Sequence, residues 1–161
     1  MLTHQLHDLL GDAARDMFTS CGETVASSEP HDHSGQQYGG VLGIIGNDLS
    51  GSALIVVEAS VLVATNPAPD IPVAKWLAEL TNQIVGRFKN ELLRRGVEVW
   101  LAIPTVLRAT KLTPLMQNAI EPIHLRVGSG AVTLWLEFEG SPTLAEPVEA
   151  EAAREGDALM F

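Results

Sequence analysis

Residues 74–106 decide the fold, and they read AKWLAELTNQIVGRFKNELLRRGVEVWLAIPTV. Apolar residues recur in this stretch every three to four positions, which is the period of an amphipathic helix. Pro72 suits the first turn of such a helix and Gly96 suits its C-terminal stop, so we predict a long helix over residues 72–95. Its apolar side carries Val73, Leu77, Leu80, Ile84, Phe88 and Leu92.

The opposite side of the predicted helix is polar. It carries Lys75, Glu79, Asn82, Gly86, Lys89 and Asn90. Glu79 and Asn82 are three residues apart, so they project from the same face of a helix. Gly86 follows about one turn later and costs about 1 kcal/mol relative to alanine. It either admits the close approach of another backbone or is a tolerated surface glycine.

The segments around this helix predict a sheet. Short apolar runs separated by turn residues indicate two hairpins and one further strand: 38–45 with 52–57, 97–103 closed by Pro104, and 123–127 with 131–139. Helical spacing also predicts an N-terminal helix that contains Leu6–Phe18 and a short helix over 59–64, whereas 105–119 fit neither period. We therefore expect an α/β (α+β) fold with a largely antiparallel sheet.

The length and charge of the chain limit its classes of partner. It has 161 residues, 46% of them hydrophobic and 19% charged, which is ordinary for one globular domain. The net charge of −10 repels nucleic-acid phosphates and anionic lipids. No secretory signal and no apolar run of membrane-spanning length are visible. We expect a cytoplasmic protein with neither nucleic acid nor membrane as a partner.

The C-terminal stretch differs in composition from the rest of the chain. Residues 141–161 read SPTLAEPVEAEAAREGDALMF, which is acidic and contains proline and alanine without a clear apolar period. Such a composition is typical of a mobile extension. We predict a domain over residues 1–140 followed by an acidic tail over 141–161.

Three other features of the sequence could suggest a functional site, but the pattern of residues supports no such site in any of them. His31, Asp32 and His33 are possible metal ligands, but adjacent residues in a loop rarely supply a closed site, so we predict no metal. The glycine-rich stretch at 39–51 lacks the lysine and the Ser/Thr of a phosphate-binding loop. Cys21 has no evident histidine partner and, as the single cysteine, allows no internal disulfide.

The polar helix face carries a resemblance to a known family. Glu79-x-x-Asn82, followed 22 positions later by Pro104, resembles the pattern of the CheX branch of the CheC/CheX/FliY family of chemotaxis phosphatases. Gly86 and the Pro-Thr-Val at 104–106 also match members of that family, and the resemblance covers roughly residues 1–140. Lys75 departs from the family pattern, which usually has Asp or Ser at that position. A lysine there could pair with Glu79 and compete for it.

The resemblance implies a phosphatase that hydrolyses the aspartyl phosphate of a response-regulator receiver domain such as CheY. Asn82 would orient the attacking water, and Glu79 would pair with a lysine of the receiver. Gly86 and Lys75 would lie on the docking face, and Pro104 would be structural. The Mg²⁺ of the reaction would belong to the receiver, so no cofactor is expected in this chain.

The resemblance also implies a homodimer that forms through the sheet. A second interpretation stays open, in which the chain is a non-catalytic CheX-like interaction module that binds a partner or itself. Lys75 and the acidic tail favour this alternative over catalysis.

Overall fold

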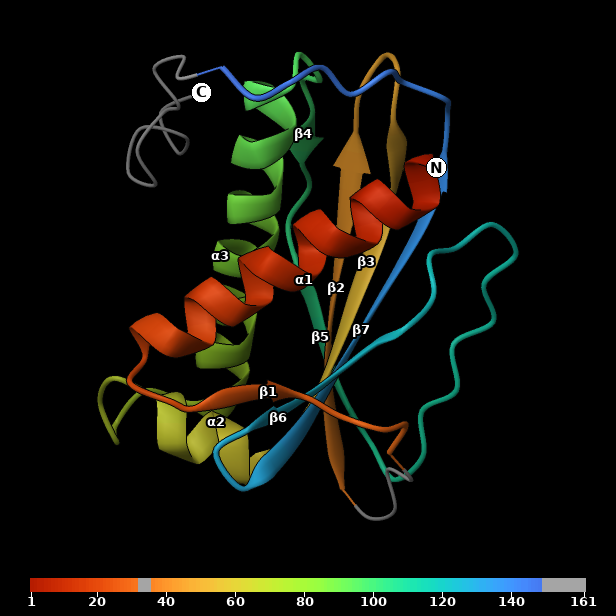
Figure 1. The fold of residues 1–161 in the computed structure, drawn as a ribbon. Helices are drawn as coiled ribbons and strands as arrows, with labels where there is room; N and C mark the ends of the chain where they lie inside the picture. The colour runs from red at the N-terminus through yellow and green to blue at the C-terminus, as the bar shows by residue number, and fades with distance from the viewer. Residues whose placement is uncertain (32–35, 149–161) are drawn as a thin grey trace.

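The computed structural model describes residues 1–31 and 36–148 (Figure 1). In chain order the helices and strands are α1 (Leu2–Ser20), β1 (Val25–Ser27), β2 (Gln37–Ile45), β3 (Ser50–Glu58), α2 (Ala59–Thr65), α3 (Val73–Arg94), β4 (Trp100–Leu101), β5 (Thr105–Ala109), β6 (Ile123–Val127) and β7 (Gly130–Glu139). Both predicted hairpins and all three predicted helices are present.

The strands form one sheet in the order β1-β6-β7-β3-β2-β4, and β5 also pairs with β2. Each of these pairings is antiparallel. Figure 1 shows α1 lying obliquely across the sheet, with α3 beside it and α2 near the start of α3. A single core joins both long helices to the sheet and includes Leu10 and Phe18 of α1, Leu77 and Phe88 of α3, and Ile55 and Leu134 of the sheet. The expected α+β fold is confirmed.

A glycine in β2 allows α3 to approach the sheet closely. A Cβ atom on Gly40 would overlap the Oγ1 atom of Thr81, which is fully buried. The Thr81 hydroxyl donates a hydrogen bond of 2.7 Å to the carbonyl oxygen of Leu77, one turn earlier. This contact fixes the rotation of α3 about its axis, and therefore the direction in which the next residue, Asn82, projects.

The buried side of α3 is wider than its apolar period predicts. Val73 was expected to face inward, but it begins the helix and is 37% exposed. Trp76, Thr81 and Val85 are buried instead, because α3 packs against α1, α2 and β2 rather than against one surface. The indole of Trp76 donates a hydrogen bond of 3.0 Å to Oγ1 of Thr65, which ties the start of α3 to α2.

The strand predicted over residues 97–103 is shorter in the structure. Only Trp100 and Leu101 form β4; a link over residues 102–104 follows, and β5 begins at Thr105. β4 pairs with the end of β2 and β5 pairs with its start, so the chain follows β2 along one edge of the sheet. Proline has no N–H to donate to a ladder, which accounts for the break before Thr105.

Residues 141–148 lie against the domain and form no regular element. The amides of Ala145 and Val148 each donate a hydrogen bond of 3.0 Å to the carbonyls of Arg95 and Arg94, so this segment supplies partners for the last turn of α3. Residues 149–161 lie outside the described residues, and their separation as a mobile tail stays a prediction. Within the described part, no helix is both long enough and apolar enough to cross a bilayer.

Candidate functional site

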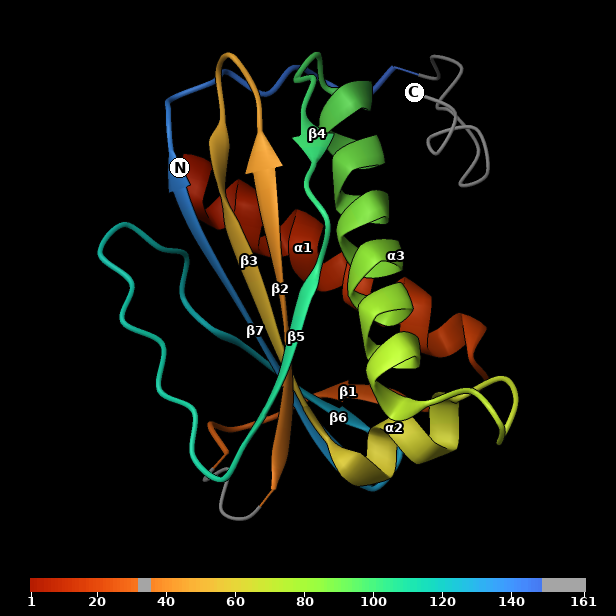
Figure 2. The same cartoon turned by 180° about the vertical axis from the view of Figure 1, so that it is seen from behind.

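The candidate residues of α3 lie together on its outer side. Lys75 and Glu79 are exposed, and Asn82 and Gly86 are partly exposed. Their spacings of three, four and seven residues place them on one face of the helix, opposite the buried side that contacts α1 and the sheet. Figure 2 shows this helix from the side on which β4 and β5 run beside it.

The carboxylate of Glu79 is held by a neighbour that sequence analysis did not single out. Its Oε1 atom accepts a hydrogen bond of 2.7 Å from Nε2 of Gln83, one turn further along α3. The competing ion pair expected between Lys75 and Glu79 does not form among the described residues. The spacing of four residues between Glu79 and Gln83 is a signal that could have found this contact.

Asn82 presents a carboxamide that has no hydrogen-bond partner among the described residues. The side chain is partly exposed, and the buried Thr81 beside it holds the helix in register with β2. A carboxamide offers two donors and one acceptor and carries no charge. It can therefore hold a water molecule beside an anionic group without repelling that group.

Gly86 leaves an open position beside Asn82. A Cβ atom placed there would meet no atom within 4 Å, and the backbone φ angle is not in the positive range that favours glycine. Neither the packing nor the backbone of this chain therefore requires a glycine at this position. The open position is available to another molecule.

Gly86→Ala is expected to raise the free energy of unfolding by about 1 kcal/mol, because alanine removes the entropic cost of glycine within a helix. Urea denaturation followed by circular dichroism would measure the change. Gly40→Ala is the matched control, since the same added methyl group is blocked there and should destabilise the protein. A destabilised Gly86→Ala variant would contradict the open position.

Pro104 is not on α3. It lies in the link between β4 and β5, on the edge of the sheet that contacts α3, and is partly exposed. The structure thus gathers Glu79, Asn82 and Gly86 on one helix face and places Pro104 on the neighbouring edge. Pro104 separates β4 from β5, and this structural role accounts for the residue without a chemical one.

The remaining candidate side chains form no catalytic arrangement among the described residues. Burial raises the pKa of the Cys21 thiol, which disfavours the reactive thiolate. The rings of His31 and His124 meet edge to face with centroids 5.8 Å apart, while Asp32 and His33 lie outside the described residues. The described part contains no group of three or more His, Cys, Asp or Glu side chains arranged to hold a metal ion.

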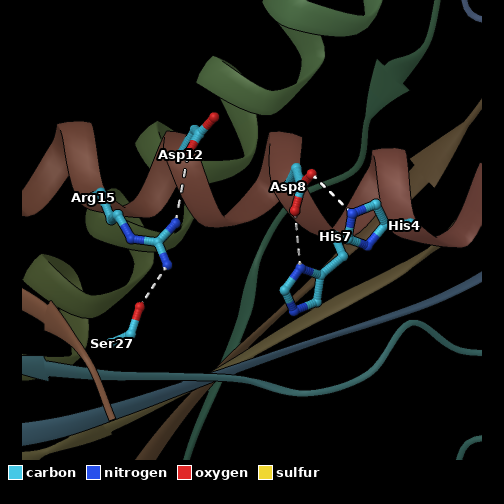
Figure 3. Close-up of polar contacts among 6 residues, drawn as sticks. All are labelled: His4, His7, Asp8, Asp12, Arg15 and Ser27. Atoms are coloured by element: carbon cyan, nitrogen blue, oxygen red, sulfur yellow. Dashed lines mark hydrogen bonds and ion pairs between the residues drawn. The ribbon is translucent and has the colours of Figure 1, made fainter.

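The outer face of α1 carries a row of polar contacts (Figure 3). His4 and His7 approach the two oxygens of Asp8 at 3.5 and 3.4 Å, and Arg15 lies 3.5 Å from Asp12. Arg15 also donates a hydrogen bond of 3.1 Å to Oγ of Ser27, which links α1 to β1. Exposed pairs of this kind contribute about 0–1 kcal/mol each, so we assign them a minor structural role.

A cleft of about 460 Å³ lies on the surface where α1 and α3 meet. Its lining includes Asp12 and Asp16 of α1 and Arg87, Glu91 and Arg95 of α3. None of the candidate residues lines it, although Asn90, one turn after Gly86 on α3, does. The cleft is therefore not part of the candidate site.

Comparison with known protein families gives one match. The model of the family described as chemotaxis phosphatase CheX matches residues 36–126, which include Glu79, Asn82, Gly86 and Pro104. No curated protein sequence matches the chain.

Solved structures share the fold at low sequence identity. A CheX protein from Desulfovibrio desulfuricans is 19% identical, with a TM-score of 0.70 over 84% of this chain and 99% of its own. CheX from Vibrio vulnificus is 18% identical, with a TM-score of 0.67 over 81% of this chain and 93% of its own. CheX in a CheX–CheY–BeF3–Mg²⁺ complex from Borrelia burgdorferi is 14% identical, with a TM-score of 0.55 over 83% of this chain and 95% of its own.

Proposed function

The chain belongs to the CheX family of chemotaxis phosphatases, and we propose that it hydrolyses the aspartyl phosphate of a response-regulator receiver domain. The observation that carries this proposal is the carboxamide of Asn82. It is partly exposed and has no hydrogen-bond partner among the described residues, and it stands one turn from the exposed carboxylate of Glu79. This is the arrangement that an inserted, water-positioning side chain needs.

The proposed chemistry requires positioning more than covalent participation. Hydrolysis of a phosphoryl group needs a water molecule in line with the phosphorus atom and the leaving oxygen. Asn82 would accept a hydrogen bond from that water while its amide donates to a phosphoryl oxygen, which fixes the geometry of attack. We place the Mg²⁺ that neutralises the developing charge on the receiver.

Glu79 would hold the two proteins together. Its carboxylate is exposed, and its Gln83 hydrogen bond is made by a neutral donor within one helix. A lysine beside the phosphorylation site of the receiver supplies a charged donor, which makes a stronger hydrogen bond than a neutral one. Glu79 would therefore exchange Gln83 for that lysine when the partner docks.

The partner class is supported by one structural relative. The Borrelia burgdorferi protein was solved in complex with CheY, BeF3 and Mg²⁺. For the present chain we infer a CheY-type receiver as the substrate, because the matched family region contains the whole Glu79–Asn82–Gly86 face.

The direct test compares phosphate release from a phosphorylated receiver with and without this protein. A CheY-type receiver is phosphorylated with acetyl phosphate in the presence of Mg²⁺, excess phosphodonor is removed, and released phosphate is followed over time. We expect faster release with the protein present. A rate equal to that of the receiver alone would overturn the proposed hydrolysis and favour a non-catalytic interaction module, the alternative that the Lys75 departure supports.

We also propose that a second copy of the chain binds the edge formed by β4 and β5. Four large apolar residues are exposed on or beside this edge: Ile45 (59%), Trp100 (47%), Ile103 (90%) and Leu107 (37%). Ile45 and Trp100 are paired across β2 and β4, so they form a continuous patch. An edge strand with exposed apolar side chains is suited to pairing with another chain.

Trp100→Lys is expected to convert a dimer of 17.2-kDa chains into a monomer, because it places a charge at the centre of this patch. Light scattering after size-exclusion chromatography would measure the mass. Leu115→Lys is the matched control, since Leu115 is 92% exposed and lies off the edge. A monomeric native chain would contradict the proposed dimer, and loss of the dimer in the control would contradict its location.

A further inference from the structure

The lysines of this chain are unevenly placed. The sequence has three, and two of them, Lys75 and Lys89, lie on α3. Asn82 stands midway, seven residues from each, so all three share one face of the helix. At 1.5 Å per residue, each lysine is about 10 Å from Asn82 along the helix axis.

The two lysines are available to an external partner. Neither forms an ion pair with a described carboxylate. Glu79 accepts a hydrogen bond of 2.7 Å from Gln83, which is neutral and leaves the carboxylate its negative charge. Glu91, the other acidic residue of α3, pairs with Arg94 at 2.8 Å and Arg95 at 3.9 Å. The face around Asn82 therefore carries two lysines against the single uncompensated carboxylate of Glu79, in a chain whose net charge is −10.

We propose that Lys75 and Lys89 form an electrostatic guide that draws the acidic phosphorylation pocket of the partner onto Asn82. The inference rests on the proposed function and extends it, because it assigns Lys89 and gives Lys75 a positive role. A phosphoryl group adds close to two negative charges to the phosphorylated aspartate pocket, and the bound Mg²⁺ offsets only part of the combined charge of phosphoryl group and carboxylates. One lysine lies on each side of Asn82 along the axis of α3. The pair attracts such a pocket from both sides and centres it on the carboxamide.

The distances suit steering rather than tight contact. About 10 Å is close to the Debye length at physiological ionic strength, so attraction is felt during approach and weakened by added salt. Charges at the rim of an interface act mainly on the association rate. Nucleic acid is a poorer match for this surface, since a polyanion would also meet the acidic remainder of the chain.

The test measures association with a CheY-type receiver loaded with BeF3 and Mg²⁺, which mimics the phosphorylated state without turnover. The variants are Lys75→Glu, Lys89→Glu and the two combined, each checked for native unfolding. Lys111→Glu is the matched control, because Lys111 is exposed and lies after β5, off α3. Stopped-flow mixing gives association and dissociation rates at low and physiological salt.

We expect each α3 variant to lower the association rate about tenfold at low salt and about threefold at physiological salt, as Coulomb's law with screening implies for a reversed charge near a divalent anion. Dissociation should change less than about twofold, and the control should match the native chain. Lys75→Gln and Lys89→Gln should show about half of the effect on a logarithmic scale.

Three results would overturn the guide. One is equal association by the native chain and all three α3 variants, which would leave the proposed hydrolysis intact. Another is an equal loss in Lys111→Glu, which would reduce the effect to net charge. Lysine-dependent binding of a duplex oligonucleotide in preference to the receiver would assign the face to another partner. Failure of the proposed function is recognised separately, as a native chain that releases no phosphate.

Discussion

Asn82→Ala is expected to lower the rate of receiver dephosphorylation at least about 100-fold, to a level close to that of the receiver alone. The magnitude follows from losing the group that orients the attacking water, since misplacing a reacting group by about 1 Å costs a similar factor. Because the proposed reaction depends on positioning and not on a covalent step, the carboxamides of Gln83 and Asn90, at other positions of α3, should not restore the rate. Phosphate release from acetyl phosphate-treated receiver measures the loss.

The control for Asn82→Ala separates chemistry from folding and docking. The Asn82 carboxamide has no hydrogen-bond partner among the described residues, and alanine is the better helix former, so the free energy of unfolding should be unchanged or slightly higher. Affinity for the BeF3-loaded receiver should stay within a few-fold of the native value. Asn82→Asp should be equally inactive, because it places a negative charge against the phosphoryl group. Unchanged phosphate release by Asn82→Ala would eliminate the proposed role.

The helix that carries the site could be predicted because its signals are local. Apolar spacing fixed the extent of α3 to within one residue at either end, with Pro72 before its first turn and Gly96 after its last. Both hairpins were predicted for the same reason, since turn residues separate their strands. The wider buried side of α3, with Trp76 and Val85, depends on α2 and β2 and has no signature in the helix sequence.

The strands at the edge of the sheet could not be predicted from local sequence patterns. The run from residue 97 to residue 103 alternates like a single strand, but only Trp100 and Leu101 pair with the end of β2, as β4. The separate strand β5, beyond Pro104, pairs with the start of β2. The start of β5 looked irregular because its side chains are mostly exposed at an edge, where apolar alternation is not required. Register with a distant strand, and not the local pattern, decides this region.

Within the candidate site, the residues could be predicted more readily than their partners. Helical spacing placed Glu79 and Asn82 on one exposed face, which the structure bears out. It offered two neighbours for Glu79 at equal separation, Lys75 before it and Gln83 after it, and the structure pairs it with Gln83. Spacing alone cannot make that choice, because both neighbours lie four residues from Glu79 and the lean of helical side chains toward the N-terminus favours both pairs alike.

Gly40→Ala is expected to destabilise the protein by about 2–3 kcal/mol, the upper part of the range for overpacking a core. The added Cβ would overlap Oγ1 of Thr81, whose hydroxyl is already committed to the Leu77 carbonyl at 2.7 Å and is fully buried. The strand and helix must separate to relieve the overlap. Urea denaturation of the variant measures the cost.

This contact also positions the candidate site, and a double-mutant cycle tests that link. Thr81→Ala removes the overlapping hydroxyl, so Gly40→Ala should cost about 1–2 kcal/mol less in that background than alone. In the Gly40→Ala variant with native Thr81, α3 shifts and Asn82 shifts with it, so phosphate release should fall several-fold in protein that is still folded. Gly86→Ala is the matched control for an added methyl group that moves nothing. Equal costs in both backgrounds would show that Thr81 does not set the distance between α3 and β2, and would remove the reason for a fixed Asn82.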